Sequence, residues 1–281
     1  MSLKWYFAIS EPSLDREHHD FRNLIRVAVE SARQNTQLRP NMLYDGEPND
    51  FTREMAGKGV NVIPHRVSFY PELQQHSRTL SWAELYLSTA TGAFLRTEIP
   101  LIETEDDFVL YTDCDVMFMK DIPAFPCPEA FAVVVEGAPD ALDINTGVML
   151  TNVRRSRDNF SEFRKFIRTN LHQFTIYDQS AYSLFYAQQN GTLKPELNWR
   201  PYWGFNENAV VVHWHGPKPI AVRDLLDDAS ADLSDENHWR PFFLREPDSY
   251  RRYFAIWAAF FTDSLRSDSA GRFDGGHENR S

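Results

Sequence analysis

The stretch FVLYTDCD, residues 108–115, sets the interpretation of the whole chain. Its first four residues are apolar and predict a buried strand, and Asp113 and Asp115 follow that strand closely. In open α/β sheets, ligands bind beyond the carboxyl ends of the strands. Two carboxylates at such a place can hold one hard divalent cation, which in turn binds phosphate oxygens. The alternative is a pair of turn-forming aspartates, because Asp is common in turns.

A competing chemistry uses the same spacing. Phosphatases of the haloacid dehalogenase class also place Asp-x-Asp after an apolar strand, and they typically carry a threonine two residues later. This chain has Met117 at that position, which offers no hydroxyl group. The sequence therefore favours cation and phosphate binding over phosphatase chemistry.

The residues before this stretch alternate between strand and helix patterns. Short apolar runs predict strands at residues 5–9, 41–44 and 60–63. Helical spacing of apolar residues predicts helices at 21–32 and 80–96, and a polar helix is expected to end near Gly57 and Gly59. This alternation predicts an α/β fold with a parallel sheet covered by helices.

The second half of the chain continues this pattern and then departs from it. Further strands are expected at residues 131–135 and 210–215, and helices at 160–171 and from Asp178 onward. Residues 223–236 are acidic and predict a loop, whereas the aromatic stretch 250–261 predicts a helix that packs back on the domain. We interpret 1–266 as a single domain, with 223–266 as a C-terminal helical and loop appendage and 267–281 as a disordered tail.

Composition narrows the function. A chain of 281 residues can bury a substantial core, and its net charge of −11 argues against binding to nucleic acid, which needs a basic face. The start is too short and polar for a signal peptide, and no apolar run approaches the roughly 18 residues of a membrane span. Cys114 and Cys127 are too few for a disulfide scaffold. We therefore expect a cytoplasmic protein.

A second group of candidate ligands lies in VVVHWHGPKP, residues 210–219. Strand alternation places His213 and His215 on one face of the strand. Gly216 allows a ligand to approach the backbone closely, and Lys218 can bind phosphate as a point charge. A neutral imidazole here could complete the coordination of a metal held by the two aspartates. The alternative is a structural histidine in an apolar strand.

Two further elements are ambiguous by themselves. In DINTGVMLTN, residues 143–152, Asn145 and Gly147 suit a turn that enters a strand. Asp178 and Gln179 open a predicted helix, where a carboxylate is often an N-terminal cap favoured by the helix dipole.

Taken together and in this order, the motifs resemble glycosyltransferase family 8 and its relatives with the GT-A fold. The matching segments are FLRTEIP at 94–100, VLYTDCD at 109–115, NTGV at 145–148, DQ at 178–179 and HWHGPKP at 213–219. The resemblance spans about residues 5 to 220, and the five motifs in sequence are specific where each alone is weak. It implies a GT-A fold, with a mixed, mostly parallel sheet flanked by helices.

The resemblance also implies a role for each matching residue. Asp113, Asp115 and His213 would hold Mn²⁺ or Mg²⁺ against the donor diphosphate. The nucleotide and its phosphates would be contacted by Ala8, Ser10, Arg96, Asp113, Gly216 and Lys218. Asn145, Asp178 and Gln179 would line the pocket of the donor sugar, with Gln179 or Asp178 nearest the reacting carbon.

Two departures from the family pattern leave alternatives open. The last motif has one residue fewer between glycine and lysine, so alignment on Gly216 selects His213 as the ligand and His215 remains the alternative. At the end of the first strand, residues 8–12 lack the acidic residue and the asparagine that family members place around the base. The expected preference for uridine therefore has no support from residues 8–12 and depends on the other motifs.

The whole set predicts a metal-dependent glycosyltransferase that moves a hexose from a nucleotide-sugar, expected to be a UDP-sugar. The acceptor would be a glycan, a lipid-linked sugar or a small molecule, and the resemblance implies retention of configuration. A catalytically silent nucleotide-sugar binder is one alternative. A sugar nucleotidyltransferase is another, although residues 10–13 lack the glycine-rich phosphate loop of such enzymes.

Two aromatic groups admit two interpretations each. Trp199, Tyr202, Trp203 and Phe205 could form a stacking platform for an acceptor sugar, or they could pack in the core. The helix expected at 250–261 contains two arginines and could rest on a membrane that carries a lipid-linked acceptor, or it could cover the core.

Overall fold

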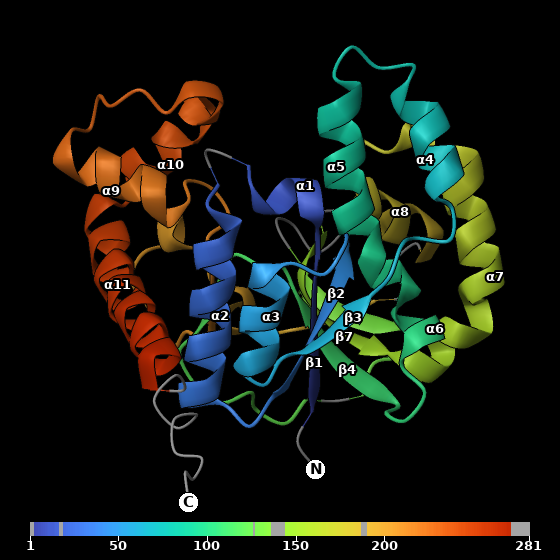
Figure 1. Cartoon of the computed structure of the whole chain (residues 1–281), viewed down its shortest axis with the longest axis horizontal. Coiled ribbons are helices and arrows are strands. Elements are labelled where there is room, and N and C mark those ends of the chain that lie inside the picture. Colours follow the sequence, from blue (N-terminus) through green and yellow to red (C-terminus); the bar gives the residue numbers. More distant parts are fainter. Residues whose placement is uncertain (1–2, 17–18, 126, 136–143, 187–189, 271–281) are drawn as a thin grey trace, which may run out of the picture.

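A seven-stranded sheet with the order β3-β2-β1-β4-β7-β6-β8 forms the centre of the fold (Figure 1). The computed structural model describes residues 3–16, 19–125, 127–135, 144–186 and 190–270. The strands of this sheet are β1 (Lys4–Ser10), β2 (Arg39–Asp45), β3 (Asn61–Pro64), β4 (Phe108–Thr112), β6 (Phe131–Val135), β7 (Ile144–Asn152) and β8 (Gly191–Thr192). A second sheet consists of β5 (Val116–Phe118) and β9 (Val211–His213).

The sheet is mixed and mostly parallel, as the sequence predicts. β1 pairs in parallel with β2 and β4, and β2 pairs in parallel with β3. β7 is antiparallel to both β4 and β6, while β6 and β8 are parallel. The segment around Asn145 and Gly147 lies inside β7 rather than in a turn that enters it, because Ile144 already pairs with Val135. Asp143, the first residue of that motif, lies outside the described residues.

Helices cover both faces of the large sheet (Figure 1). They are α1 (Glu11–Leu14), α2 (Phe21–Asn35), α3 (Asp50–Gly57), α4 (Tyr70–Ser77), α5 (Ala83–Phe94), α6 (Ile99–Ile102), α7 (Val153–Asn170), α8 (Tyr177–Tyr186), α9 (Pro219–Asp227), α10 (Arg240–Arg245) and α11 (Pro247–Ala270). Along β1, Trp5 and Phe7 pack toward α2 and α3, whereas Tyr6 and Ala8 pack toward α5. This alternation with a period of two residues gives the sheet one apolar layer on each side.

One buried carboxylate, that of Glu103, holds the chain in place directly after α6. The Glu103 side chain is 1% exposed and accepts hydrogen bonds from Lys4 Nζ at 2.9 Å and Tyr6 Oη at 2.8 Å. The backbone N–H groups of Glu105 and Asp106 also donate to it. Burial opposes ionisation, but these donors outweigh it and lower the pKa of Glu103 to about 2.

The C-terminal region is more helical than the sequence predicts. Residues 223–227 belong to α9 instead of an acidic loop, because Val222 and Leu225 are buried one helical turn apart and Pro219 sits at the N-terminus of the helix. The strand expected at 210–215 is also shorter. It ends at His213, and Gly216 then takes a left-handed φ of 115° that turns the chain into α9.

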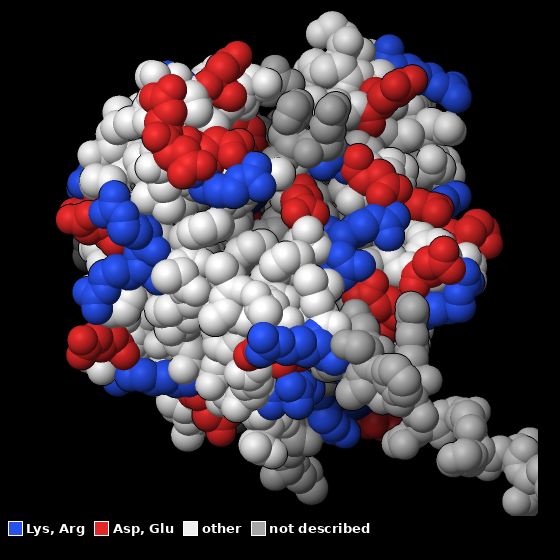
Figure 2. All heavy atoms as spheres, turned by 60° about the vertical axis from the view of Figure 1, so that its left-hand side comes forward, with Lys and Arg blue, Asp and Glu red and all other residues white. Residues whose placement is uncertain are grey.

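Helix α11 packs back on the domain against α2 and α9, with Tyr253 and Trp257 buried. Figure 2 brings this side of the molecule forward, and both basic and acidic side chains border the uncharged area in the middle of the view. None of the described helices is long and apolar enough to span a membrane. Helix α11 continues to Ala270, and residues 271–281 of the predicted tail lie outside the described residues.

Candidate active site

Pairing between two short strands brings the candidate metal ligands together. Asp113 directly follows β4, and its N–H donates to the carbonyl oxygen of Gly147 at 2.8 Å, which extends the β4–β7 ladder. Asp115 directly precedes β5, whose Val116 pairs with His213 of β9. The antiparallel β5–β9 ladder therefore places an imidazole from a distant part of the chain beside the two carboxylates.

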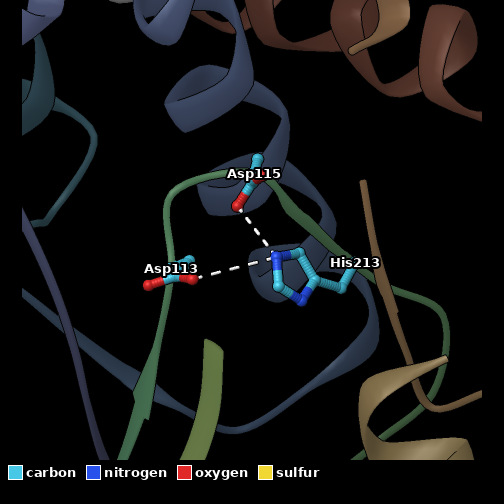
Figure 3. A group of neighbouring side chains, drawn as sticks. All are labelled: Asp113, Asp115 and His213. Atoms are coloured by element: carbon cyan, nitrogen blue, oxygen red, sulfur yellow. Dashed lines mark ion pairs between the residues drawn. The ribbon is translucent and has the colours of Figure 1, made fainter. Parts of the chain in front are cut away.

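Asp113, Asp115 and His213 point toward one another (Figure 3). His213 Nε2 lies 3.3 Å from Asp115 Oδ1 and 3.8 Å from Asp113 Oδ2. One ligand atom from each residue lies within 4.8 Å of the others. Carboxylate oxygens are ligands that Mg²⁺ and Mn²⁺ prefer, and an imidazole nitrogen also serves Mn²⁺, so this donor set fits the predicted cation. His213, not His215, belongs to this group.

A buried amide pair orients the imidazole. His213 Nδ1 lies 2.9 Å from Asn198 Oδ1, and the Asn198 Nδ2 group donates to Asn145 Oδ1 at 2.9 Å. Since an amide oxygen can only accept, Nδ1 carries a proton in this arrangement, and Nε2 is the ring nitrogen that faces the two carboxylates. Asn145, predicted to line the sugar pocket, thus also supports His213 through Asn198.

Only a glycine fits at the centre of this arrangement. A methyl group built on Gly147 would lie 2.3 Å from His213 Cε1 and 2.8 Å from Asp113 Oδ2. Both distances are far below ordinary contact, so any side chain here would separate the imidazole from the carboxylate.

Lys218 approaches Asp115 from the loop that precedes α9. Its Nζ donates to Asp115 Oδ2 at 2.7 Å and to the carbonyl oxygen of Trp214 at 2.8 Å. Burial alone would raise the pKa of Asp115, but Lys218 and His213 outweigh burial and hold this pKa well below its usual value. Asp115 is therefore ionised in the free protein, with an ammonium group already beside it.

Arg96 links the aspartate pair to the start of α8. Its Nη2 donates to Asp113 Oδ1 at 2.6 Å, its Nη1 donates to the Thr146 carbonyl oxygen at 2.7 Å, and its Nε lies 3.1 Å from Asp178 Oδ2. The guanidinium also lies over the ring of Tyr111, 4.2 Å from its centroid. Burial raises the pKa of Asp178 to about 6, although Arg96 acts in the opposite direction.

A cavity of about 270 Å³ opens beside these residues at the carboxyl edge of the sheet. Most residues predicted from the sequence line it: Ala8, Ser10, Arg96, Asp113, Asp115, Asn145, Asp178, Gln179 and His215. Lys218 and His213 contact Asp115 without belonging to this lining. Gly216 does not belong to this lining, and a methyl group built on it would lie 3.3 Å from Tyr250 Oη.

Several residues of the site were not predicted from the sequence. Ser13, Arg16, Phe21, Thr89, Gly92 and Tyr177 line the cavity, and Asn198 orients His213. Gly92 lets α5 approach the end of β1, because a methyl group there would lie 3.3 Å from the Ser10 backbone nitrogen. No sequence motif identifies Asn198, because its contact with His213 depends on how β9 packs in the folded protein.

His215 contributes to the cavity wall rather than to the cation group. Its Nδ1 lies 3.1 Å from the Tyr202 hydroxyl, and its ring packs edge-on against Trp239. Burial lowers the pKa of His215 to about 3, so this imidazole is neutral at physiological pH.

The aromatic group predicted as a possible sugar platform packs in the core instead. Tyr202 is buried, and Trp199, Trp203 and Phe205 pack partly buried against the same cluster, which also contains Trp214 and Tyr253. Trp199 and Trp203 meet edge to face, with ring centroids 5.4 Å apart. None of these four residues belongs to the described lining of the cavity.

Comparison with solved structures identifies the class of fold. The galactosyltransferase LgtC, solved in complex with donor and acceptor sugar analogues, superposes with a TM-score of 0.57 and 17% identity over 77% of this chain and 89% of LgtC. The glycosyltransferase GlyE of Streptococcus pneumoniae TIGR4 gives 0.60 and 15% over 95% of this chain. This chain spans 64% of the GlyE chain.

A third solved structure, the bifunctional glycosyltransferase WbbM, gives a TM-score of 0.52 at 11% identity over 87% of this chain and 52% of WbbM. No family model matches the chain, and no curated protein matches it. The chain has the GT-A glycosyltransferase fold, which confirms the fold predicted from the five motifs.

Proposed function

We propose that this protein is a glycosyltransferase that uses a divalent cation to move a hexose from a nucleotide-sugar to a glycan, lipid-linked or small-molecule acceptor. The observation that carries the proposal is the convergence of Asp113, Asp115 and His213 beside a cavity at the carboxyl edge of a GT-A sheet. LgtC, which shares this fold, was solved with both donor and acceptor sugar analogues. Binding of the same two kinds of substrate is proposed for this chain.

Asp113, Asp115 and His213 are the proposed ligands of Mn²⁺ or Mg²⁺. Such a cation, when bound, would supply positive charge to the diphosphate oxygens and so stabilise the departing nucleotide. The contact of Nδ1 with Asn198 leaves Nε2 as the ring nitrogen that would bind the cation. The Asp113 side chain is 32% exposed, so phosphate oxygens could reach it from the cavity.

The remaining side chains have proposed roles in binding and orientation. Lys218 can turn its ammonium from Asp115 toward the diphosphate, and Arg96 holds Asp113 and Asp178 in a fixed relation. Asp178 and Gln179 are proposed to lie nearest the reacting carbon. Retention needs no strong general base opposite the leaving group, so an amide side chain is compatible with that position.

A UDP-sugar is the proposed donor, because the motifs resemble those of family 8 transferases. Ala8 and Ser10 line the cavity at the end of β1, where the nucleotide is expected. A cytoplasmic location and membrane contact through α11 both stay predictions.

Activity measurements with a panel of nucleotide-sugars and Mn²⁺ test the proposal. Asp115→Asn keeps the shape of the side chain but removes its charge, and we expect at least a hundredfold loss of transfer or donor hydrolysis, as for EDTA treatment. Asp50→Asn is the matched control, because the Asp50 side chain is fully exposed on α3. Full activity of Asp115→Asn, or of the wild type in EDTA, contradicts the metal role.

A binding measurement separates this proposal from its alternative. Tight nucleotide binding with no turnover on any donor or acceptor would identify a silent nucleotide-sugar binder.

A further inference from the structure

Arg16 is a cation of the cavity wall. Burial lowers the pKa of Arg16, and Glu236, which is paired with His19, acts in the opposite direction without forming an ion pair with Arg16. Arg16 follows α1, close to the carboxyl end of β1, and it is half-buried. Its Nη2 donates to Thr89 Oγ1 at 2.7 Å and to Ser88 Oγ at 3.3 Å, both of which are neutral hydroxyl oxygens on α5. In the part of the chain that the structure describes, Arg16 forms no ion pair.

The other cations of the site differ from Arg16 in this respect. Arg96 contacts Asp113 and Asp178, and Lys218 contacts Asp115. Burying a guanidinium without an anionic partner costs free energy, and arginine stays charged under all ordinary conditions. Because Arg16 contacts only hydroxyl groups directly and Glu236 acts on it from beyond ion-pair distance, its guanidinium can receive an anion from outside the protein.

Arg16 lies near the residues proposed to line the sugar pocket rather than near those proposed to bind the diphosphate. Tyr177 lines the cavity together with Arg16 and Thr89, and burial raises the pKa of the Tyr177 hydroxyl, although the charge of Arg16 acts to lower it. Tyr177 directly precedes Asp178 and Gln179, and its backbone has a φ of 35°, a conformation that costs a non-glycine residue free energy and is common at ligand sites.

We propose that Arg16 binds a carboxylate or phosphate group carried by a substrate sugar, either the donor's sugar or the acceptor, and so selects an acidic sugar substrate. This inference rests on the proposed glycosyltransferase function. The planar guanidinium has unused N–H donors that match the two oxygens of a carboxylate or phosphate. The proposal makes Arg16 a specificity-determining residue, with the nucleotide and its diphosphate bound by other groups.

The donor arm of the test uses calorimetric titration in Mn²⁺ with UDP, UDP-glucose and UDP-glucuronic acid. We expect the wild type to prefer the glucuronic acid donor over the glucose donor by about tenfold or more, the size of a charge-assisted contact. Arg16→Gln should abolish that preference while UDP and UDP-glucose bind as before, and Arg16→Lys should retain part of it. Arg53→Gln, at an exposed ion pair on α3, is the control.

The acceptor arm uses protein saturated with UDP and Mn²⁺, titrated with glucose 6-phosphate, methyl glucuronide and methyl glucoside. A preference for the acidic sugars that Arg16→Gln abolishes supports the proposal and identifies the acceptor as the source of the anion.

Two results overturn the proposal. One is a wild type without preference for acidic sugars in either arm. The other is an Arg16→Gln variant that weakens UDP and UDP-glucose as much as the acidic ligands, because Arg16 would then contact the nucleotide. Failure of the wild type to bind any nucleotide with Mn²⁺ refutes the proposed function itself, whereas normal UDP binding without acid preference refutes only the role of Arg16.

Discussion

Replacing Gly147 with alanine tests the geometry of the cation site without changing any of its proposed ligands. The added methyl group would lie 2.3 Å from His213 Cε1, more than 1 Å short of the 3.4 Å at which ordinary contact begins. It would also lie 2.8 Å from Asp113 Oδ2. Both groups must therefore move outward from β7, in different directions, and the imidazole must move by about 1 Å.

The expected size of the effect follows from that displacement. Metal sites tolerate deviations of about 0.2 Å in ligand distance, so a shift of about 1 Å should weaken Mn²⁺ binding by about 10- to 100-fold. Overpacking should cost about 1 to 3 kcal/mol of stability, which corresponds to a fall in Tm of about 2 to 10 °C for a domain of this size. Calorimetric titration with Mn²⁺ and thermal unfolding measure the two effects separately.

Gly57→Ala is the matched control for this variant. Gly57 is the last residue of α3, and a methyl group built there has no neighbour within 4 Å. Alanine is favoured over glycine in helices by up to about 1 kcal/mol, so this variant should bind Mn²⁺ normally and be as stable as the wild type or more so. A Gly147→Ala protein with wild-type Mn²⁺ affinity and unchanged Tm would refute the packing described for β7.

Three further predictions concern the surroundings of the site and one distant ion pair. Asn198→Ala removes the acceptor that fixes the His213 tautomer, and Mn²⁺ affinity measured by titration should fall by about tenfold. Lys218→Met should weaken UDP binding in the presence of Mn²⁺ by about tenfold. Binding of Mn²⁺ alone should stay equal or become tighter, because the ammonium no longer competes for Asp115. Equal losses for both ligands would argue against this role of Lys218. Glu103 has a folded-state pKa of about 2, below its ordinary value of 4.5, so its contribution is fully present above pH 4.5 and lost as the pH falls toward 2. Urea unfolding at pH 7 should show Glu103→Gln to be less stable by about 2 to 3 kcal/mol, with a smaller difference at pH 3.

The strands and helices of the first half of the chain could be predicted directly, because local patterns of apolar residues determine them. Alternating apolar runs and helical spacing identify β1 to β4 and their helices, and parallel strands end at one edge of a sheet. The position of Asp113 after β4 therefore follows from the sequence, as does the presence of Asp115 nearby. The GT-A fold was predicted from the order of the five motifs, because the pattern of strands and helices alone does not distinguish it from other α/β folds.

The remaining features depend on contacts between distant segments. The strand at 210–215 is predicted, but β5 has only three residues, too few for a periodic signal. The pairing of β5 with β9, which carries His213 to the aspartates, therefore could not be predicted. The contact between Arg16 and Thr89 depends on how closely α5 approaches the end of β1, which Gly92 permits. Gly216 matched a family motif, and its left-handed φ of 115°, which depends on how the chain turns from β9 into α9, was not predicted.

The pairing of β5 with β9 also means that the site spans two sheets of unequal size. Asp113 follows β4 of the main sheet, whereas Asp115 precedes β5 and the imidazole lies on β9 of the small sheet. The β5–β9 ladder has three residue pairs, and the backbone of Trp199 also hydrogen-bonds to β9. Fraying of that ladder would withdraw the imidazole while the main sheet stays folded. We therefore expect heat to open the cation site and inactivate the protein before the main sheet melts.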